Sequence, residues 1–476
     1  MADRGRIARN TVFLSLAHGA SKFFSILLTM FATRILGAAG YGLYTAGNTF
    51  IEVGRVLAGG GLDYLVTREV ADDRRDTTRV ASAAAAVKTL LSAIAYLILI
   101  FAVWKLHYPS AVLHVVLILG TIVFLENISD IADAVFQGAQ RMDYITRTML
   151  LSSASIFVFA TAALLFGLGI LGFVTGITLG CLVRTLVGTS FLRRNFGRLS
   201  LREVENDEVR RLLRAAVPLM GATVLSLLFH RIDILMLSRM VDERFWGYYG
   251  VAVRVIDVVV LAPRILATAV YPQLRLAREK GEAPTVALIG GSTRVTLVFC
   301  SALAIAVWIF APFIVRVMAG SEFLPAVGAL RVLAWAIALQ AGCHMMVRLL
   351  FAADRERDLL PIGAIGIVAN VILNALLIPR MGIQGAALAT FVSYGLTLVL
   401  YFYYARRAGF RVPLWSSAGG ALSALAAAIL ITVLLRGQAL WLRAVLCALG
   451  WFLVLTVLRV NSVKELQEAL RLLRKR

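Results

Sequence analysis

Residues 34–53 read RILGAAGYGLYTAGNTFIEV, and residues 239–258 read RMVDERFWGYYGVAVRVIDV, a related stretch that lies 205 residues further along the chain and aligns without a gap. The matched positions include charged, glycine and aromatic residues: Arg34 with Arg239, Gly42 with Gly247, Tyr44 with Tyr249, and Glu52 with Asp257. Chance similarity between two apolar segments is the competing explanation. A direct repeat of this length is typical of transporters built from two parallel halves.

The composition of the whole chain indicates that its solvent is lipid. The 476 residues are 60% hydrophobic and only 16% charged, and the mean hydropathy is +0.84. A water-soluble domain of this composition would expose extensive apolar surface. The net charge of +21 would suggest a nucleic-acid partner in a soluble protein, but here the basic residues must first be placed relative to a membrane. Nucleic acid is therefore not an expected partner.

Apolar segments long enough to cross a bilayer occur about fourteen times, which predicts an all-α polytopic membrane protein. The predicted spans are 11–33, 41–66, 81–103, 111–135, 145–166, 170–192, 214–237, 247–270, 286–309, 326–350, 359–378, 384–404, 416–435 and 441–460. The four cysteines, Cys181, Cys300, Cys343 and Cys447, each lie in an apolar run far from the others. We interpret them as core residues rather than a redox pair or metal site.

Basic residues concentrate in alternate connections, which predicts a cytoplasmic N-terminus and C-terminus in the cytoplasmic (inner) membrane. The most basic connection, residues 193–214, separates the two halves. The predicted organisation is a six-helix lobe at 1–195, a cytoplasmic linker at 196–213, a second six-helix lobe at 214–408, two additional transmembrane helices at 409–460, and an amphipathic basic tail on the cytoplasmic membrane surface at 461–476.

Polar side chains recur at helical spacing in the first, second, seventh and eighth spans. Because a charged group facing lipid is costly, such stripes usually face a cavity or a partner. Glu52 and Arg55 are three residues apart near the middle of one span, and so are Arg254 and Asp257 in the equivalent span of the other half. We expect each pair to close on itself. The alternative is that these charges only hold helices together.

Two further stripes and one asparagine pair are open to either interpretation. Glu126, Asp130 and Asp133 follow one face of the fourth span, with Gln137 one turn on. Another stripe, in the tenth span, consists of Gln340, His344 and Arg348. Cavity lining and interhelix packing explain both stripes equally well. Asn370 and Asn374 are one turn apart and are expected to form interhelical hydrogen bonds.

The sequence contains no nucleotide-binding loop, no metal-type histidine spacing and no nucleophile motif. We therefore expect neither an enzyme nor a cofactor or metal site. Without a nucleotide site, vectorial work would draw on substrate gradients, ion gradients or the membrane potential.

The order and spacing of several short motifs resemble the polysaccharide biosynthesis or oligosaccharide-lipid flippase family, relatives of O-antigen and lipid II flippases in the multidrug/oligosaccharidyl-lipid/polysaccharide exporter superfamily. The motifs are RILGAAGYGLY from Arg34, QGAQRMDY from Gln137, RID at Arg231, WGYYGVAVRV from Trp246 and IPRMGIQGAALAT from Ile378. The resemblance covers the whole chain. It implies a V-shaped pair of six-helix lobes with a central cavity lined by the first, second, seventh and eighth helices.

The resemblance also implies a substrate, a polyprenyl-diphosphate-linked oligosaccharide moved to the outer leaflet by alternating access. Partners implied with it are membrane lipids and glycan-assembly proteins. The basic residues that would hold the diphosphate are Lys22, Arg55, Arg231, Arg254 and Arg264. Acidic or coupling residues would be Glu52, His230, Asp233 and Asp257, and coupling to H+ or Na+ through Asp233 or His230 stays open. An arginine fork matches phosphate oxygens, and acids can neutralise it when the cavity is empty.

Two other functions compete with this interpretation. The stripes contain acids and bases about evenly, so a cation-coupled multidrug antiporter of the same superfamily is the alternative. The additional C-terminal spans and the basic residues favour the flippase. A membrane-embedded glycan polymerase or acyltransferase is less favoured, because the longest predicted outer connection runs only over residues 310–325.

Overall fold

The computed structural model describes residues 2–59, 61–72, 77–199, 204, 206–412, 442, 446–451 and 453. Within these residues every regular element is a helix, which confirms the all-α prediction. Nine of the described helices are long and apolar enough to cross a membrane by length and composition. The helices form two compact units, Met1–Gly247 with Met318–Gly320, and Tyr248–Val317 with Ser321–Arg476.

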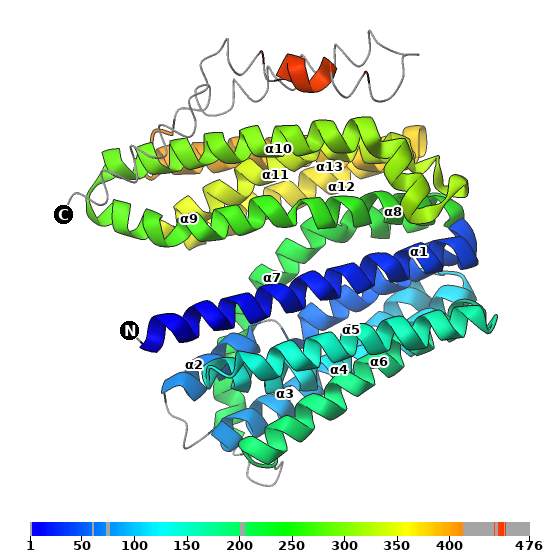
Figure 1. Ribbon diagram of the computed structural model, residues 1–476, viewed down its shortest axis with the longest axis vertical. Helices are drawn as coiled ribbons and strands as arrows, with labels where there is room; N and C mark the ends of the chain where they lie inside the picture. The colour runs from blue at the N-terminus through cyan, green and yellow to red at the C-terminus, as the bar shows by residue number, and fades with distance from the viewer. Residues whose placement is uncertain are drawn as a thin grey trace. The chain divides into compact units, whose positions relative to one another are not determined.

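The first unit contains seven helices and the start of an eighth (Figure 1). They are α1 (Ala2–Gly59), α2 (Leu62–Asp72), α3 (Thr77–Lys105), α4 (Ser110–Gly138), α5 (Met142–Leu165), α6 (Gly169–Asn195), α7 (Asn206–Met240) and the beginning of α8 (Glu243–Val259). Helices α5 and α6 approach closely, because a Cβ atom on Gly176 would lie 2.6 Å from the Ala160 backbone. Small residues at such contacts are typical of membrane helices.

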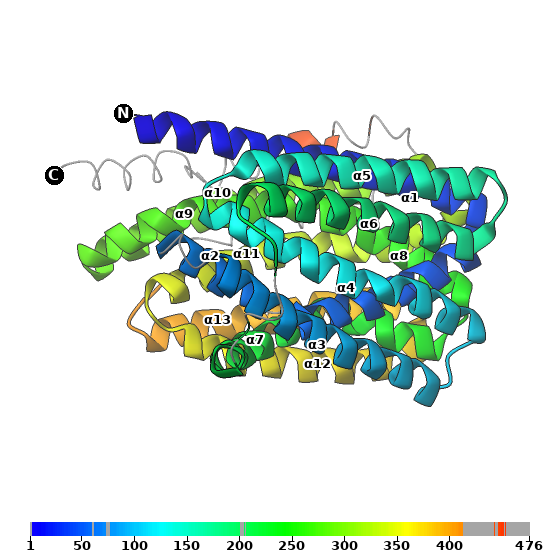
Figure 2. The same cartoon turned by 90° about the horizontal axis from the view of Figure 1, so that it is seen from below.

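Helix α1 consists of two arms joined at Gly37, whose φ of 66° and ψ of −175° interrupt the helix. Only glycine adopts this backbone conformation at low cost. The first arm packs along α5, as Figure 2 shows, with Ser21 Oγ 2.7 Å from Ser153 Oγ. The second arm runs the opposite way along α4. The two arms correspond to the first two predicted spans, but the second arm ends at Gly59 and α2 continues separately.

The two ends of the first unit are called the His107 end and the Glu208 end, after a residue at each. At the His107 end, α3 passes into α4 and α7 passes into α8. At the Glu208 end, α7 begins, and Glu208 Oε2 accepts a hydrogen bond of 3.0 Å from Arg79 Nε of α3. Helix α7 packs against α1 and α3 of the first unit. Its start at Asn206 also places the second half of the predicted 193–214 loop in helical turns.

The second unit contains the rest of α8 and seven further elements. They are α9 (Leu261–Glu279), α10 (Glu282–Ala319), η2 (Ser321–Phe323), α11 (Ala326–Ala352), η3 (Glu356–Asp358), α12 (Leu359–Met381) and α13 (Ile383–Arg407). The predicted span at 247–270 is divided at Val260 into α8 and α9. Both halves of the chain therefore break their second span.

Several smaller predictions are confirmed in the described residues. All four cysteines are buried, and no disulfide joins them. Asn370 Nδ2 donates to Ser393 Oγ at 3.1 Å between α12 and α13, and Asn374 Nδ2 donates to Asn370 Oδ1 at 2.8 Å. The predicted span at 416–435 and the tail at 461–476 lie outside the described residues. Of the predicted span at 441–460, residues 442, 446–451 and 453 are described, and they are helical.

Candidate transport site

A charged pair joins the second arm of α1 to α7 in the first unit. Arg231 Nε donates to Glu52 Oε2 at 2.7 Å. The other oxygen of the Glu52 carboxylate, Oε1, accepts a hydrogen bond of 3.0 Å from Asn48 Nδ2 one turn earlier. Both charged side chains are mostly buried. The pair links the two sequence repeats, because α7 opens the second repeat and the α1 arm belongs to the first.

A second charged pair joins the same arm to α4. Arg55 Nε lies 2.5 Å from Glu126 Oε2. The Glu126 side chain is only 15% exposed, whereas that of Arg55 is 43% exposed. Arg55 is thus anchored by a buried acid, and part of its side chain stays exposed.

The predicted Glu52–Arg55 pair is wrong, because each residue binds a different helix. Residues three apart on an α-helix point about 60° apart around its axis. Glu52 therefore faces α7 and Arg55 faces α4. Pairing between helices gives both charges a partner without bending either side chain back along its own helix.

The acidic stripe on α4 has a structural role. Arg184 of α6 donates to Asp133 Oδ2 at 2.6 Å and lies 3.3 Å from Asp130 Oδ1. Together with the Glu126–Arg55 pair, these contacts show that all three acids of this stripe bind neighbouring helices. Interhelix packing is therefore the interpretation that the structure supports for Glu126, Asp130 and Asp133.

A polar network continues from α4 into α3 and α2. Lys88, whose side chain is 1% exposed, forms an ion pair with Asp63 of α2. Asn127 Nδ2 donates to Ser92 Oγ at 2.6 Å, and Ser129 Oγ lies 2.9 Å from Thr185 Oγ1. Lys88 and Arg184 are not among the site residues predicted from the sequence. The signal was present, because a single lysine or arginine inside an apolar span normally faces a polar partner.

The Lys88–Asp63 pair should respond unequally to loss of its two members. Asp63→Asn leaves a buried ammonium without its acid and should lower stability by about 3–5 kcal/mol. Lys88→Met removes the buried charge and leaves Asp63, which is 43% exposed, so it should cost far less. Thermal unfolding midpoints in detergent would measure both variants and the double variant, which should resemble Lys88→Met. A larger loss from Lys88→Met than from Asp63→Asn would contradict this prediction.

The remaining predicted site residues fall into two groups. In the first unit, Lys22 is exposed on the first arm of α1, His230 Nδ1 lies 2.7 Å from Ser226 O, and the buried Asp233 accepts a hydrogen bond from the Ile234 amide at 2.8 Å. In the second unit, Arg254 and Asp257 are half-buried on α8, and Arg264 is exposed on α9. The structure thus brings Arg55, Glu52 and Arg231 onto neighbouring helices of one unit.

Outside the predicted spans, Arg275 of α9 donates from Nη1 to Asp354 Oδ1 at 2.6 Å. This hydrogen bond raises the pKa of Arg275 and keeps the guanidinium charged. Among the described residues, no group of three or more His, Cys, Asp or Glu side chains is arranged to hold a metal ion.

The fold is similar to those of two solved transporters. Lipid II flippase MurJ, solved in an inward closed conformation, is similar over 95% of this chain and 100% of its own, with a TM-score of 0.76 and 13% identity. An inward-facing multidrug resistance MATE family transporter of the MOP superfamily is similar over 84% of this chain and 98% of its own, with a TM-score of 0.68 and 15% identity. The broken second spans and the paired intramembrane charges accord with such a transporter.

The sequence profile of the family described as Polysaccharide biosynthesis protein matches residues 7–275, more than half of the chain, and the chain belongs to that family. Among its relatives is the probable low-salt glycan biosynthesis flippase Agl15 of Haloferax volcanii, which is 28% identical over 173 residues. The match covers 36% of this chain and 37% of that protein, so it spans just over a third of the relative's length.

Proposed function

We propose that this protein is a flippase that moves a polyprenyl-diphosphate-linked oligosaccharide across the cytoplasmic membrane by alternating access. The observation that carries the proposal is Arg55, a basic residue inside a predicted membrane span whose side chain is partly exposed and whose guanidinium is paired with a buried acid. Family membership and the similarity to the flippase of Haloferax volcanii support the substrate class. None of these relatives is described as an enzyme, and we propose transport without covalent change of the glycan.

The ion pairs supply a mechanism for taking up and releasing an anion. An incoming diphosphate would bind the open side of Arg55 and would compete with Glu52 for Arg231. Charge-assisted hydrogen bonds from arginine to phosphate oxygens are strong and geometrically matched. When the substrate leaves, the acids neutralise the arginines again, so no base stays unpaired inside the membrane. Lys22, Arg254 and Arg264 would complete the set of bases, and Asp257 would release Arg254.

The direction and coupling of transport are also proposals. The basic connections favour cytoplasmic termini, so the His107 end of the first unit would face outward. His230 and Asp233 lie on α7 near Arg231, and either could carry a coupling H+ or Na+. Glycan-assembly proteins would deliver and collect the lipid-linked sugar.

A cation-coupled multidrug antiporter is the second candidate. It is favoured by the similarity to the MATE transporter and by the acids that form ion pairs with Arg55, Arg184 and Arg231 in the first unit.

An assay with purified protein in liposomes distinguishes the two functions. We expect the protein to transfer a fluorescent polyprenyl-diphosphate oligosaccharide between the two leaflets of the liposome membrane. Quenching of the exposed fluorophore by a membrane-impermeant reductant measures this transfer. Transport of a cationic dye with no movement of the lipid would contradict the proposal, and a covalently altered glycan would indicate an enzyme.

A further inference from the structure

Two helix backbones touch at the His107 end through a pair of glycines. A Cβ atom on Gly42 would lie 2.1 Å from the carbonyl oxygen of Glu243, and one on Gly247 would lie 2.1 Å from the carbonyl oxygen of Ala38. Neither glycine has a positive φ. Glycine is therefore required at both positions because the two helices approach closely, and not because of its backbone conformation. Any side chain would collide with a backbone carbonyl group, which cannot rotate out of the way as a side chain can.

The contact is reciprocal. Each glycine meets the carbonyl group of the residue four positions before the other glycine. Gly42 and Gly247 are also equivalent in the sequence repeat, and so are Ala38 and Glu243. The same surface is thus used twice, as in an isologous contact around a two-fold axis. Within the part of the chain that the structure describes, this contact joins the second arm of α1 to the first turn of α8.

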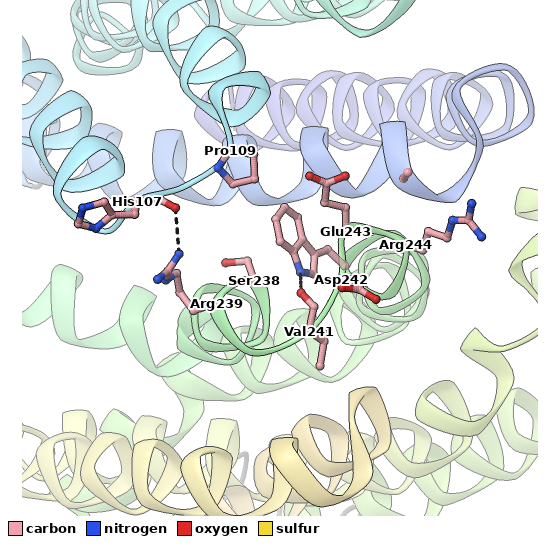
Figure 3. Close-up of a pocket in the computed structure, with 10 residues that line it drawn as sticks. His107, Pro109, Ser238, Arg239, Val241, Asp242, Glu243 and Arg244 are labelled. Carbon is pink, nitrogen blue, oxygen red and sulfur yellow. Dashed lines mark hydrogen bonds between the residues drawn. The ribbon is translucent and has the colours of Figure 1, made fainter.

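Polar contacts from two neighbouring helix connections lie beside this glycine pair. Tyr108 Oη lies 2.8 Å from Ser238 Oγ, and Arg239 Nη1 donates to the carbonyl of His107 at 3.3 Å. Figure 3 shows His107, Ser238 and Arg239 around an open cavity of about 680 Å³ beside the contact. At the Glu208 end, Arg79 and Arg211 form ion pairs.

We propose that the Gly42–Gly247 contact is a gate, closed in this structure, which must separate for the transport site to open at the His107 end. This inference rests on the proposed alternating access but not on the identity of the substrate. When two helices move apart, a side chain can rotate to maintain its contact, but a contact between two backbones cannot adjust in this way. The contact is therefore either closed or separated. Gly42 and Gly247 are positioning residues, because they set the balance between the two states without touching the substrate.

Alanine at either glycine tests the gate, and Gly221→Ala is the matched control because a Cβ atom there would meet nothing within 4 Å. Spin labels on cysteines at Leu106 and Asp242, both exposed at the His107 end, report the separation of the α3–α4 and α7–α8 connections. The four native cysteines are buried. We expect Gly42→Ala and Gly247→Ala to add a longer-distance population and to slow lipid transfer at least about tenfold. Gly221→Ala should change neither.

Ser238→Ala provides a second test that adds no volume. It removes the 2.8 Å contact with Tyr108 and should shift the distances in the same direction by a smaller amount. This variant decides the matter if the alanine substitutions at glycine do not fold. Distances in all three variants that equal those of Gly221→Ala would overturn the gate. A distance shift in a protein that moves no lipid-linked sugar would support the gate and contradict the proposed substrate.

Discussion

Arg55→Ala should strongly slow the transfer of a polyprenyl-diphosphate oligosaccharide while the protein still inserts into the membrane. Each hydrogen bond to a charged group contributes about 1.5–3 kcal/mol, so losing the bonds from Arg55 should slow transfer by roughly ten- to a hundredfold or more. The quenching assay in liposomes measures the rate. Arg254→Ala, in the equivalent span of the second repeat, should have an effect of the same kind.

The double variant Arg55→Ala with Glu126→Gln separates substrate binding from structural support. Arg55→Ala alone leaves the buried Glu126 carboxylate without its base, which by itself destabilises the protein. Neutralising Glu126 should restore thermal stability but not transfer. Recovery of transfer in the double variant would show that Arg55 only holds α1 against α4. Arg198→Ala, at an exposed position outside the spans, should leave the rate unchanged.

Arg184→Met should cause the largest loss of stability among the substitutions considered. Its guanidinium serves both Asp130 and Asp133, and its removal would leave two mostly buried carboxylates side by side. Breaking a buried ion pair by removing one partner costs about 3–5 kcal/mol. We expect a clearly lower unfolding midpoint in detergent than for the native protein.

The control for this prediction is Arg193→Met, an exposed arginine in the last turn of the same helix. Asp130→Asn combined with Asp133→Asn should suppress much of the loss, because the neutral amides no longer repel each other. If Arg184→Met and Arg193→Met unfold at the same temperature, the network contributes no net stability to the first unit.

The sequence alone was sufficient for the class of fold. Long apolar segments need helices because lipid offers no hydrogen-bond partner to an open backbone, so hydropathy identified most of the spans. It did not show that the second and eighth spans are broken, at Gly59 to Leu62 and at Val260. A hydropathy window averages over such a break, since the residues on both sides stay apolar.

The charged residues illustrate the limit more sharply. Their presence inside spans was visible in the sequence, and Glu52, Arg55 and Arg231 could be singled out from it. Their partners could not, because a helical repeat gives the direction of a side chain around its own axis and not the helix that lies beside it. Lys88 and Arg184 had no polar stripe around them, and only the packing of α2, α3, α4 and α6 shows what they bind.

Residues 34–53 and their repeat at 239–258 show the same division. From the sequence, the repeat determined that two equivalent segments exist and that Gly42 corresponds to Gly247. That these glycines also touch, each against the carbonyl of the other's helix, was decided by the tertiary structure. The physical reason is that backbone contact depends on the approach of two helices distant in the chain, and local sequence determines only which residues are small enough to permit it.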